Sequence, residues 1–172
     1  AVGFVMQHGN ISFLEAVEML AAQAGMEVPR ASPREIEQSK QEKSLYNLLG
    51  DAASFFTAQL QKPAGRDAAA YLRERGLEGE IAVNFRLGYA PMDGQALVAH
   101  LKEAGYTPAQ MMEAGLVRRS ERDQSLYSFF RDRVMFPVAD RRGRVVAFGG
   151  RVLPEHLRPL APGASKPPKY IN

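Results

Sequence analysis

The stretch FRDRVMFPVADRRGRVVAFGGRVL, residues 130–153, places two apolar, β-branched segments on either side of a turn that is rich in arginine. Apolar residues that recur with a period of two are typical of strands. We therefore predict a hairpin in which Val134–Ala139 and Arg144–Phe148 pair through residues 140–143. A buried hairpin needs the apolar residues but not so many cations around them. The surplus of positive charge indicates a surface that holds a polyanion.

The positive charge is concentrated in the last third of the chain. From Arg118 onward there are 12 Lys and Arg against 5 Asp and Glu, whereas residues 1–117 have 10 against 14. Such an asymmetry indicates a nucleic-acid or membrane surface in the basic part. The alternative is a solvated, arginine-rich face that only keeps an ordinary domain soluble.

The composition is that of a soluble globular protein, with 45% hydrophobic and 24% charged residues. No apolar run approaches the roughly 18–20 residues that span a bilayer, and no signal peptide is visible. The absence of cysteine excludes disulfides and thiolate metal sites, and it fits a reducing compartment. Because the chain opens on Ala1 rather than Met, we expect the true N-terminus to lie upstream.

Two helices are predicted before residue 62. Ser12 and Glu15 form a capping box for a short helix, and Gly25 suits its left-handed end. A second helix starts at Pro33 and runs to about Gln61. Its first half is polar and its second half apolar, so we expect a solvated tether that ends in a docked segment. Residues 28–31 between the two helices are interpreted as a linker.

Four shorter helical patterns follow, over Asp67–Arg75, Glu78–Phe85, Asp93–Ala104 and residues 107–115. The second of them is expected to close on a loop with the sequence LGYAP, residues 87–91. The predicted fold class is therefore α+β. A short helical N-terminal segment and a linker helix precede a mixed domain, which has several helices and a small, largely antiparallel sheet formed late in the chain.

Few residues suggest catalytic chemistry. His8, His100 and His156 have no partner at metal-ligand spacing, and no phosphate-binding glycine motif or nucleophile motif occurs. The carboxylates of the basic half are isolated and mostly lie next to arginines, so Asp132 is interpreted as a salt-bridge partner rather than a metal ligand. The two glycines of FGGR, which we place at the end of a strand, permit a bulge or a positive φ. They equally permit a ligand to approach the backbone beside Arg151.

The segments GFVMQ, FLEAVEMLAAQAGMEVP, YLRERGL, FRLGYAP, FRDRVMFPVADRRGRVVAFGGRVL and PKYIN, in that order, resemble bacterial DNA primase. The resemblance implies that residues 1–30 are the C-terminal end of a zinc-binding module whose ligands lie upstream, with residues 31–36 as a linker. Residues 37–172 would then be the N-terminal subdomain of the RNA polymerase core. A topoisomerase–primase (toprim) subdomain would follow, with the carboxylates that hold Mg²⁺ or Mn²⁺. No cofactor is expected on these residues themselves.

The function implied is the synthesis of short RNA primers on single-stranded DNA from ribonucleotide triphosphates, at the replication fork in the bacterial cytoplasm. The resemblance also implies contact with the replicative helicase through a C-terminal domain, which we expect to lie beyond these residues. No catalytic residue is expected here, and the chain alone should be inactive. The alternative is a non-catalytic module that binds or tethers single-stranded nucleic acid.

By the same resemblance, six residues line the groove that takes the template strand and the RNA–DNA hybrid: Arg75, Arg131, Arg133, Arg151, Lys169 and Tyr170. Their chemistry fits, because cations neutralise phosphates without reading sequence, and an exposed tyrosine can stack on a base. Without the resemblance, Arg75 would be interpreted only as a cation at a helix C-terminus. Residues 154–168, longer than the loop typical of the family here and rich in proline, have the composition of a disordered loop.

Overall fold

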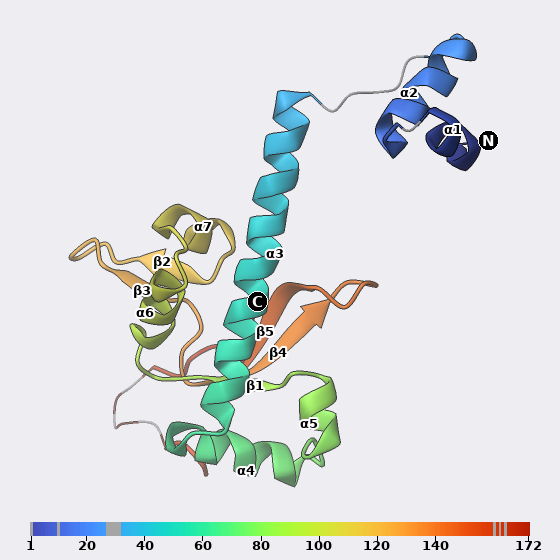
Figure 1. The fold of residues 1–172 in the computed structure, drawn as a ribbon. Helices are drawn as coiled ribbons and strands as arrows, with labels where there is room; N and C mark the ends of the chain where they lie inside the picture. Colours follow the sequence, from blue (N-terminus) through green and yellow to red (C-terminus); the bar gives the residue numbers. More distant parts are fainter. Residues whose placement is uncertain (1, 10, 27–31, 160, 162, 164) are drawn as a thin grey trace. The chain divides into compact units, whose positions relative to one another are not determined.

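The structure is a computed structural model that describes the chain except residues 1, 10, 27–31, 160, 162 and 164, and only the backbone of residues 33–40, 42 and 43. The chain divides into two compact units, Ala1–Lys40 and Gln41–Asn172 (Figure 1). The predicted linker at residues 28–31 lies outside the described residues. The side chains of much of the polar half of the helix predicted from Pro33 also lie outside the described residues.

The first unit contains two short helices in contact, α1 (Val2–Gly9) and α2 (Phe13–Gln23). The predicted capping box of α2 is confirmed, since the Ser12 amide donates to Glu15 Oε2 at 2.8 Å and the Glu15 amide donates to Ser12 Oγ at 3.4 Å. Gly25 has the predicted left-handed conformation, with a φ of 68°. Helix α1 was not predicted.

The long helix α3 (Pro33–Leu60) begins at the predicted proline. The four shorter helices agree with prediction in place and are mostly shorter than predicted: α4 (Arg66–Glu74), α5 (Glu80–Asn84), α6 (Ala96–Glu103) and α7 (Pro108–Glu113). The 3₁₀ turn η1 (Pro63–Gly65) was not predicted. Helix α7 starts with a capping box between Thr107 and Gln110. Within the described residues, no helix has both the length and the apolar character needed to cross a membrane.

An antiparallel sheet of four strands runs through the second unit in the order β1-β4-β5-β6, with β1 (Gly88–Ala90), β4 (Arg133–Ala139), β5 (Val145–Val152) and β6 (Tyr170–Ile171). A separate ribbon pairs β2 (Val117–Arg119) with β3 (Leu126–Ser128). The central hairpin β4–β5 is the predicted one, and the α+β class is confirmed.

Two details of the prediction are wrong. The segment LGYAP is not a loop, because Gly88–Ala90 is a buried strand that pairs with β4. The glycines of FGGR do not end a strand, since β5 continues through both to Val152 and neither has a positive φ. The register shift lies instead between Val138 and Ala139 on β4.

The sheet separates two sets of core side chains. Because neighbours in register share a face, one face contains the row Gly88, Met135, Gly150 and Ile171. This face belongs to the larger core, which includes the apolar side of α3 and residues of α6 and α7. The other face contains the row Tyr89, Val134, Arg151 and Tyr170, and its buried part packs with Ala68, Tyr71 and Leu72 of α4.

Gly88 brings β1 against α3 more closely than a side chain would allow. A Cβ at this position would lie 2.6 Å from both the carbonyl carbon and the Cβ of Phe56. We expect Gly88→Ala to lower the free energy of unfolding by about 3 kcal/mol, the upper end of the usual cost of overpacking. Urea unfolding followed by far-UV circular dichroism measures the change.

Gly149→Ala is the matched control on the same sheet. Its added Cβ would meet only the Phe136 carbonyl oxygen, at 4.0 Å, and we expect the stability to stay within about 1 kcal/mol of the wild type. Equal effects of the two substitutions would contradict the close approach of β1 to α3.

Candidate nucleic-acid interface

Three of the predicted site residues, Arg151, Lys169 and Tyr170, come together on the α4 side of the sheet. The Arg151 guanidinium lies 4.4 Å from the ring centre of Tyr71 on α4 and 5.8 Å from that of Tyr170. Its Nε donates to the Tyr170 hydroxyl oxygen at 3.3 Å. Lys169 Nζ lies 5.7 Å from the Tyr170 ring centre, and 63% of Tyr170 is exposed. Cations therefore surround an aromatic ring that remains open to solvent.

Arg75 belongs to the same surface. It is the exposed C-cap of α4, one turn beyond Tyr71, and its charge acts on the Tyr170 hydroxyl. Arg75 is therefore a cation at a helix C-terminus, as its position in the sequence indicates, and it also lies beside the residues with which the resemblance groups it. We call Arg75, Arg151, Lys169 and Tyr170, together with Tyr71, the basic–aromatic face.

The electrostatics of this face favour negative charge. The hydrogen bond from Arg151 lowers the pKa of Tyr170 from its usual value, and the charges of Arg151, Lys169 and Arg75 act in the same direction. Tyr89, in the same row of the sheet, behaves in the opposite way. Burial raises its pKa, and so does the hydrogen bond that its hydroxyl donates to Asp132 at 2.7 Å.

The two remaining predicted residues lie elsewhere. Arg133 is in register with Val152, beside the row of Met135 and Gly150, so it faces away from Arg151. It is only 6% exposed. Arg131 is exposed, and its guanidinium lies 5.2 Å from the ring centre of Tyr127. Both arginines line a hollow of about 300 Å³ that is also bordered by Lys166 and Ile171.

Where the structure describes the segment after β5, three ion pairs link it to the rest of the unit or within itself. Arg158 Nη2 lies 3.3 Å from Asp67 Oδ2 on α4 and 3.4 Å from Asp132 Oδ1 before β4. Lys166 pairs with Glu155 at 2.6 Å. Residues 160, 162 and 164 remain outside the description. Asp132 is thus a salt-bridge partner, as predicted, but of a distant arginine rather than of its neighbours.

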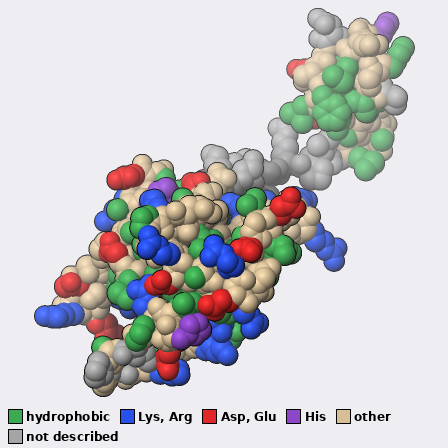
Figure 2. Space-filling model, turned by 90° about the horizontal axis from the view of Figure 1, so that it is seen from below, with side chains coloured by type: hydrophobic (Ala, Val, Ile, Leu, Met, Phe, Trp, Pro, Cys, Tyr) green, Lys and Arg blue, Asp and Glu red, His purple; other side chains and the backbone are tan. Residues whose placement is uncertain are grey.

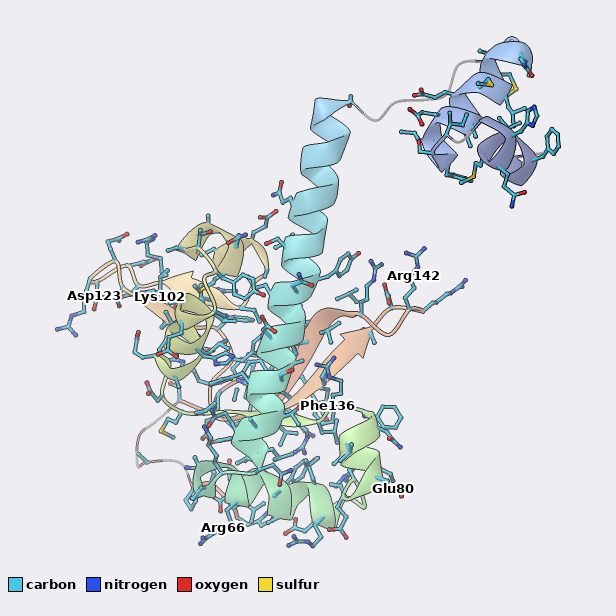
Figure 3. The ribbon with its side chains drawn as sticks, in the orientation of Figure 1. Arg66, Glu80, Lys102, Asp123, Phe136 and Arg142 are labelled. Atoms are coloured by element: carbon cyan, nitrogen blue, oxygen red, sulfur yellow. The ribbon has the colours of Figure 1, made fainter. Side chains whose placement is uncertain are left out.

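Positive side chains are not confined to this face. Figure 2 shows Lys and Arg spread over the visible surface with Asp and Glu between them. In Figure 3, Arg142 lies at the tip of the β4–β5 turn, well apart from Arg66 at the start of α4. Cations also lie over tyrosine rings elsewhere, for example Arg144 at 3.9 Å from the ring centre of Tyr46. What distinguishes the basic–aromatic face is that two cations, Arg151 and Lys169, lie near one largely exposed tyrosine ring, that of Tyr170.

The metals implied by the resemblance do not fit the donors present. Among the described residues, no group of three or more His, Asp or Glu side chains could hold a metal ion, and the chain has no cysteine. We therefore assign no chemical step to a metal on these residues.

Comparison with known proteins identifies the family. Residues 55–172 match the model of the N-terminal domain of the DNA primase catalytic core. The chain belongs to the DNA primase family. It is 45% identical over 175 residues to DNA primase of Pseudomonas putida and 36% identical over 178 residues to that of Escherichia coli. Each alignment covers 100% of this chain but only 25% and 28% of the relative, so the chain spans about a quarter of the length of these primases.

Solved primase structures share the fold. A DnaG primase catalytic domain bound to single-stranded DNA is 35% identical, with a TM-score of 0.64 over 78% of this chain and 40% of that chain. The zinc-binding and RNA polymerase domains of Aquifex aeolicus primase are 31% identical, with a TM-score of 0.63 over 99% of this chain and 38% of that chain. The primase resemblance and the α+β fold predicted from sequence are both confirmed.

Sequence reasoning missed the contact of Tyr71 with Arg151, and the ion pairs of Arg158 with Asp67 and Asp132. Tyr71 reads as one apolar position of an amphipathic helix, and Arg158 as one cation in a proline-rich loop. The helical spacing of Tyr71 and Arg75, four residues apart, was the available signal that both lie on the same side of α4.

Tyr170 should titrate below the usual tyrosine pKa of about 10. We expect Arg151→Met to raise this pKa by more than Arg75→Met does, because Arg151 both donates a hydrogen bond and is charged. Because folding lowers the pKa of Tyr170, the ionised side chain contributes to stability. This contribution is fully present at pH values above the usual tyrosine pKa and is lost as the pH falls through the lowered pKa. Titration of ¹³Cζ-labelled tyrosine by NMR checks both statements.

Tyr106 serves as an internal reference, because burial raises its pKa to about 12. A Tyr170 pKa of 10 or more in the wild type would contradict the proposed hydrogen bond and charges around its hydroxyl.

Proposed function

We propose that this chain binds the single-stranded template, and the RNA–DNA hybrid formed on it, through the basic–aromatic face. The observation that supports the proposal most is the placement of Arg151 between Tyr71 and the exposed ring of Tyr170, with Lys169 beside it. A DnaG primase catalytic domain has been solved with single-stranded DNA, and its fold matches this one. Arg131 and Arg133 belong to the same sequence prediction but not to the basic–aromatic face, and both line the hollow bordered by Lys166 and Ile171.

The face suits a strand of any sequence. Lysine and arginine contact phosphates without base discrimination, so affinity depends on salt rather than on template sequence. A tyrosine ring can stack on any base, which contributes roughly 1–3 kcal/mol in single-strand binders. Because Arg151 holds the Tyr170 hydroxyl, the ring is oriented before a base arrives, and little conformational freedom is lost on binding.

For the whole protein, we propose a DNA primase that makes short RNA primers from ribonucleotide triphosphates with divalent metal, in the bacterial cytoplasm, and that contacts the replicative helicase through another domain. Residues 1–30 would end a zinc-binding module, 31–36 would be a linker, and 37–172 would be the N-terminal subdomain of the polymerase core. The match of 99% of the chain to zinc-binding and RNA polymerase domains supports this division. We propose that the 172 residues alone are inactive, which a primer-synthesis assay with Mg²⁺ or Mn²⁺ tests.

Binding of labelled single-stranded DNA to the chain should weaken steeply with salt. We expect Lys169→Ala and Arg151→Ala each to make the plot of log K against log salt shallower by about 0.7, the value of one phosphate contact. Tyr170→Ala should weaken binding by about 1–3 kcal/mol with little change in slope, since it removes a stacking surface but no charge. Fluorescence anisotropy at several salt concentrations measures both quantities.

The control is Arg122→Ala, which removes an exposed arginine from the turn between β2 and β3. The neighbouring Asp123 lies apart from Arg66 and α4 in Figure 3. We expect no change in slope for this variant. Lys169→Ala, Arg151→Ala and Arg122→Ala could instead all make the plot of log K against log salt shallower by the same amount. Binding would then depend on net charge alone, and the basic–aromatic face would not be the site.

A further inference from the structure

Arg133 differs from the other cations of the predicted site in its burial. It is 6% exposed, one of the few charged side chains inside the described core, and burial lowers the pKa of its guanidinium. A buried cation is costly unless its donors are satisfied. Arg133 is therefore poorly suited to bind a phosphate in solvent. The hydrogen bond that its guanidinium donates shows which group it contacts instead.

The guanidinium points at the chain segment that enters β6. Arg133 Nη1 donates to the carbonyl oxygen of Pro168 at 2.8 Å, the residue directly before Lys169. The Arg133 side chain crosses Gly150 to reach it, since a Cβ at Gly150 would lie 3.1 Å from Arg133 Cδ and 2.9 Å from Phe130 Cδ1. The second glycine of FGGR thus accommodates this arginine and its aromatic neighbour rather than a ligand.

Strand β6 is attached to the sheet over a short length, and Ile171 packs against the larger core. Its register with β5 comprises two pairs, Gly150 with Ile171 and Arg151 with Tyr170, and the Val152 amide donates to the Lys169 carbonyl at 3.1 Å. So short an edge strand is marginal by itself. A charge-assisted hydrogen bond from the interior of the sheet to the residue before Lys169 stabilises its docked position.

We infer that Arg133 is a positioning residue. From the opposite face of the sheet, it fixes β6 so that Lys169 and Tyr170 stand beside Arg151, and it does not itself contact nucleic acid. Only the expected effect of Arg133 on DNA binding rests on the proposed function. The docking of β6 is a property of the chain alone.

Hydrogen exchange of the Val152 amide, observed by NMR in the 172-residue chain without DNA, tests the docking directly. Arg133→Met should speed exchange of this amide about 10- to 100-fold, the range expected for the loss of a hydrogen bond to a charged group. Arg131→Met, which removes the exposed arginine two residues earlier, is the matched control and should leave the amide unchanged. Unchanged protection of Val152 in Arg133→Met would overturn the inference.

A double-mutant cycle with single-stranded DNA separates positioning from direct contact. If Arg133 acts through Lys169 and Tyr170, Arg133→Met should weaken binding in the wild type but not in a Lys169→Ala/Tyr170→Ala background. A direct phosphate contact would instead give the same additional loss, and a salt slope shallower by about 0.7, in both backgrounds. If the wild type does not bind DNA, the proposed function fails, while the exchange result still decides the docking of β6.

The unaltered chain provides a measurement that does not depend on the variant folding. The guanidinium ¹⁵N and ¹H signals of Arg133 should exchange slowly and stay unshifted when an oligodeoxythymidine is added, whereas those of Arg151 should shift. A shift of Arg133 as large as that of Arg151 would show direct contact and overturn the inference.

Discussion

The antiparallel pairing of β4 with β5 determines on which face of the sheet the arginines of these two strands lie. Residues on a strand alternate between faces, so the register of Val134 with Arg151 assigns Arg151 to the α4 side and Arg133 to the other. A slip of one residue would exchange these positions and place a cation where Val134 is now fully buried. The apolar side chains on both faces therefore fix the register, and the register in turn fixes the chemistry of each surface.

This constraint explains why arginines that look alike in sequence behave differently in the fold. Arg131 remains exposed, Arg133 is buried against the β6 segment, and Arg151 lies between two tyrosine rings. The resemblance groups them as one set, because all three stand in the motifs FRDRVMF and FGGR. Their environments differ. Arg131 and Arg151 can contact a ligand, whereas Arg133 is suited to support such contacts.

The sequence predicted those parts of the fold that depend on local chemistry. The capping box at Ser12, the helix start at Pro33 and the hairpin around residues 140–143 follow from neighbouring residues, and all are found. Strand β1 was missed because its three residues are too short for periodicity to show, and its partner is more than forty positions away. The role of Gly150 was uncertain for a related reason. Only tertiary packing shows that the missing Cβ leaves room for Phe130 and Arg133 rather than for a ligand.

The basic–aromatic face also depends on a long connection. Residues 153–169 separate β5 from β6, yet the loop-closure entropy grows only slowly with length, by about 0.6 kcal/mol for each doubling. A longer connection in this chain therefore adds little cost, provided that its ends are held. The bond from Arg133 to Pro168 holds one end, and the ion pairs of Arg158 with Asp67 and Asp132 hold the other against α4 and β4. With both ends held, the position of Lys169 and Tyr170 is set by the sheet rather than by the length of the loop.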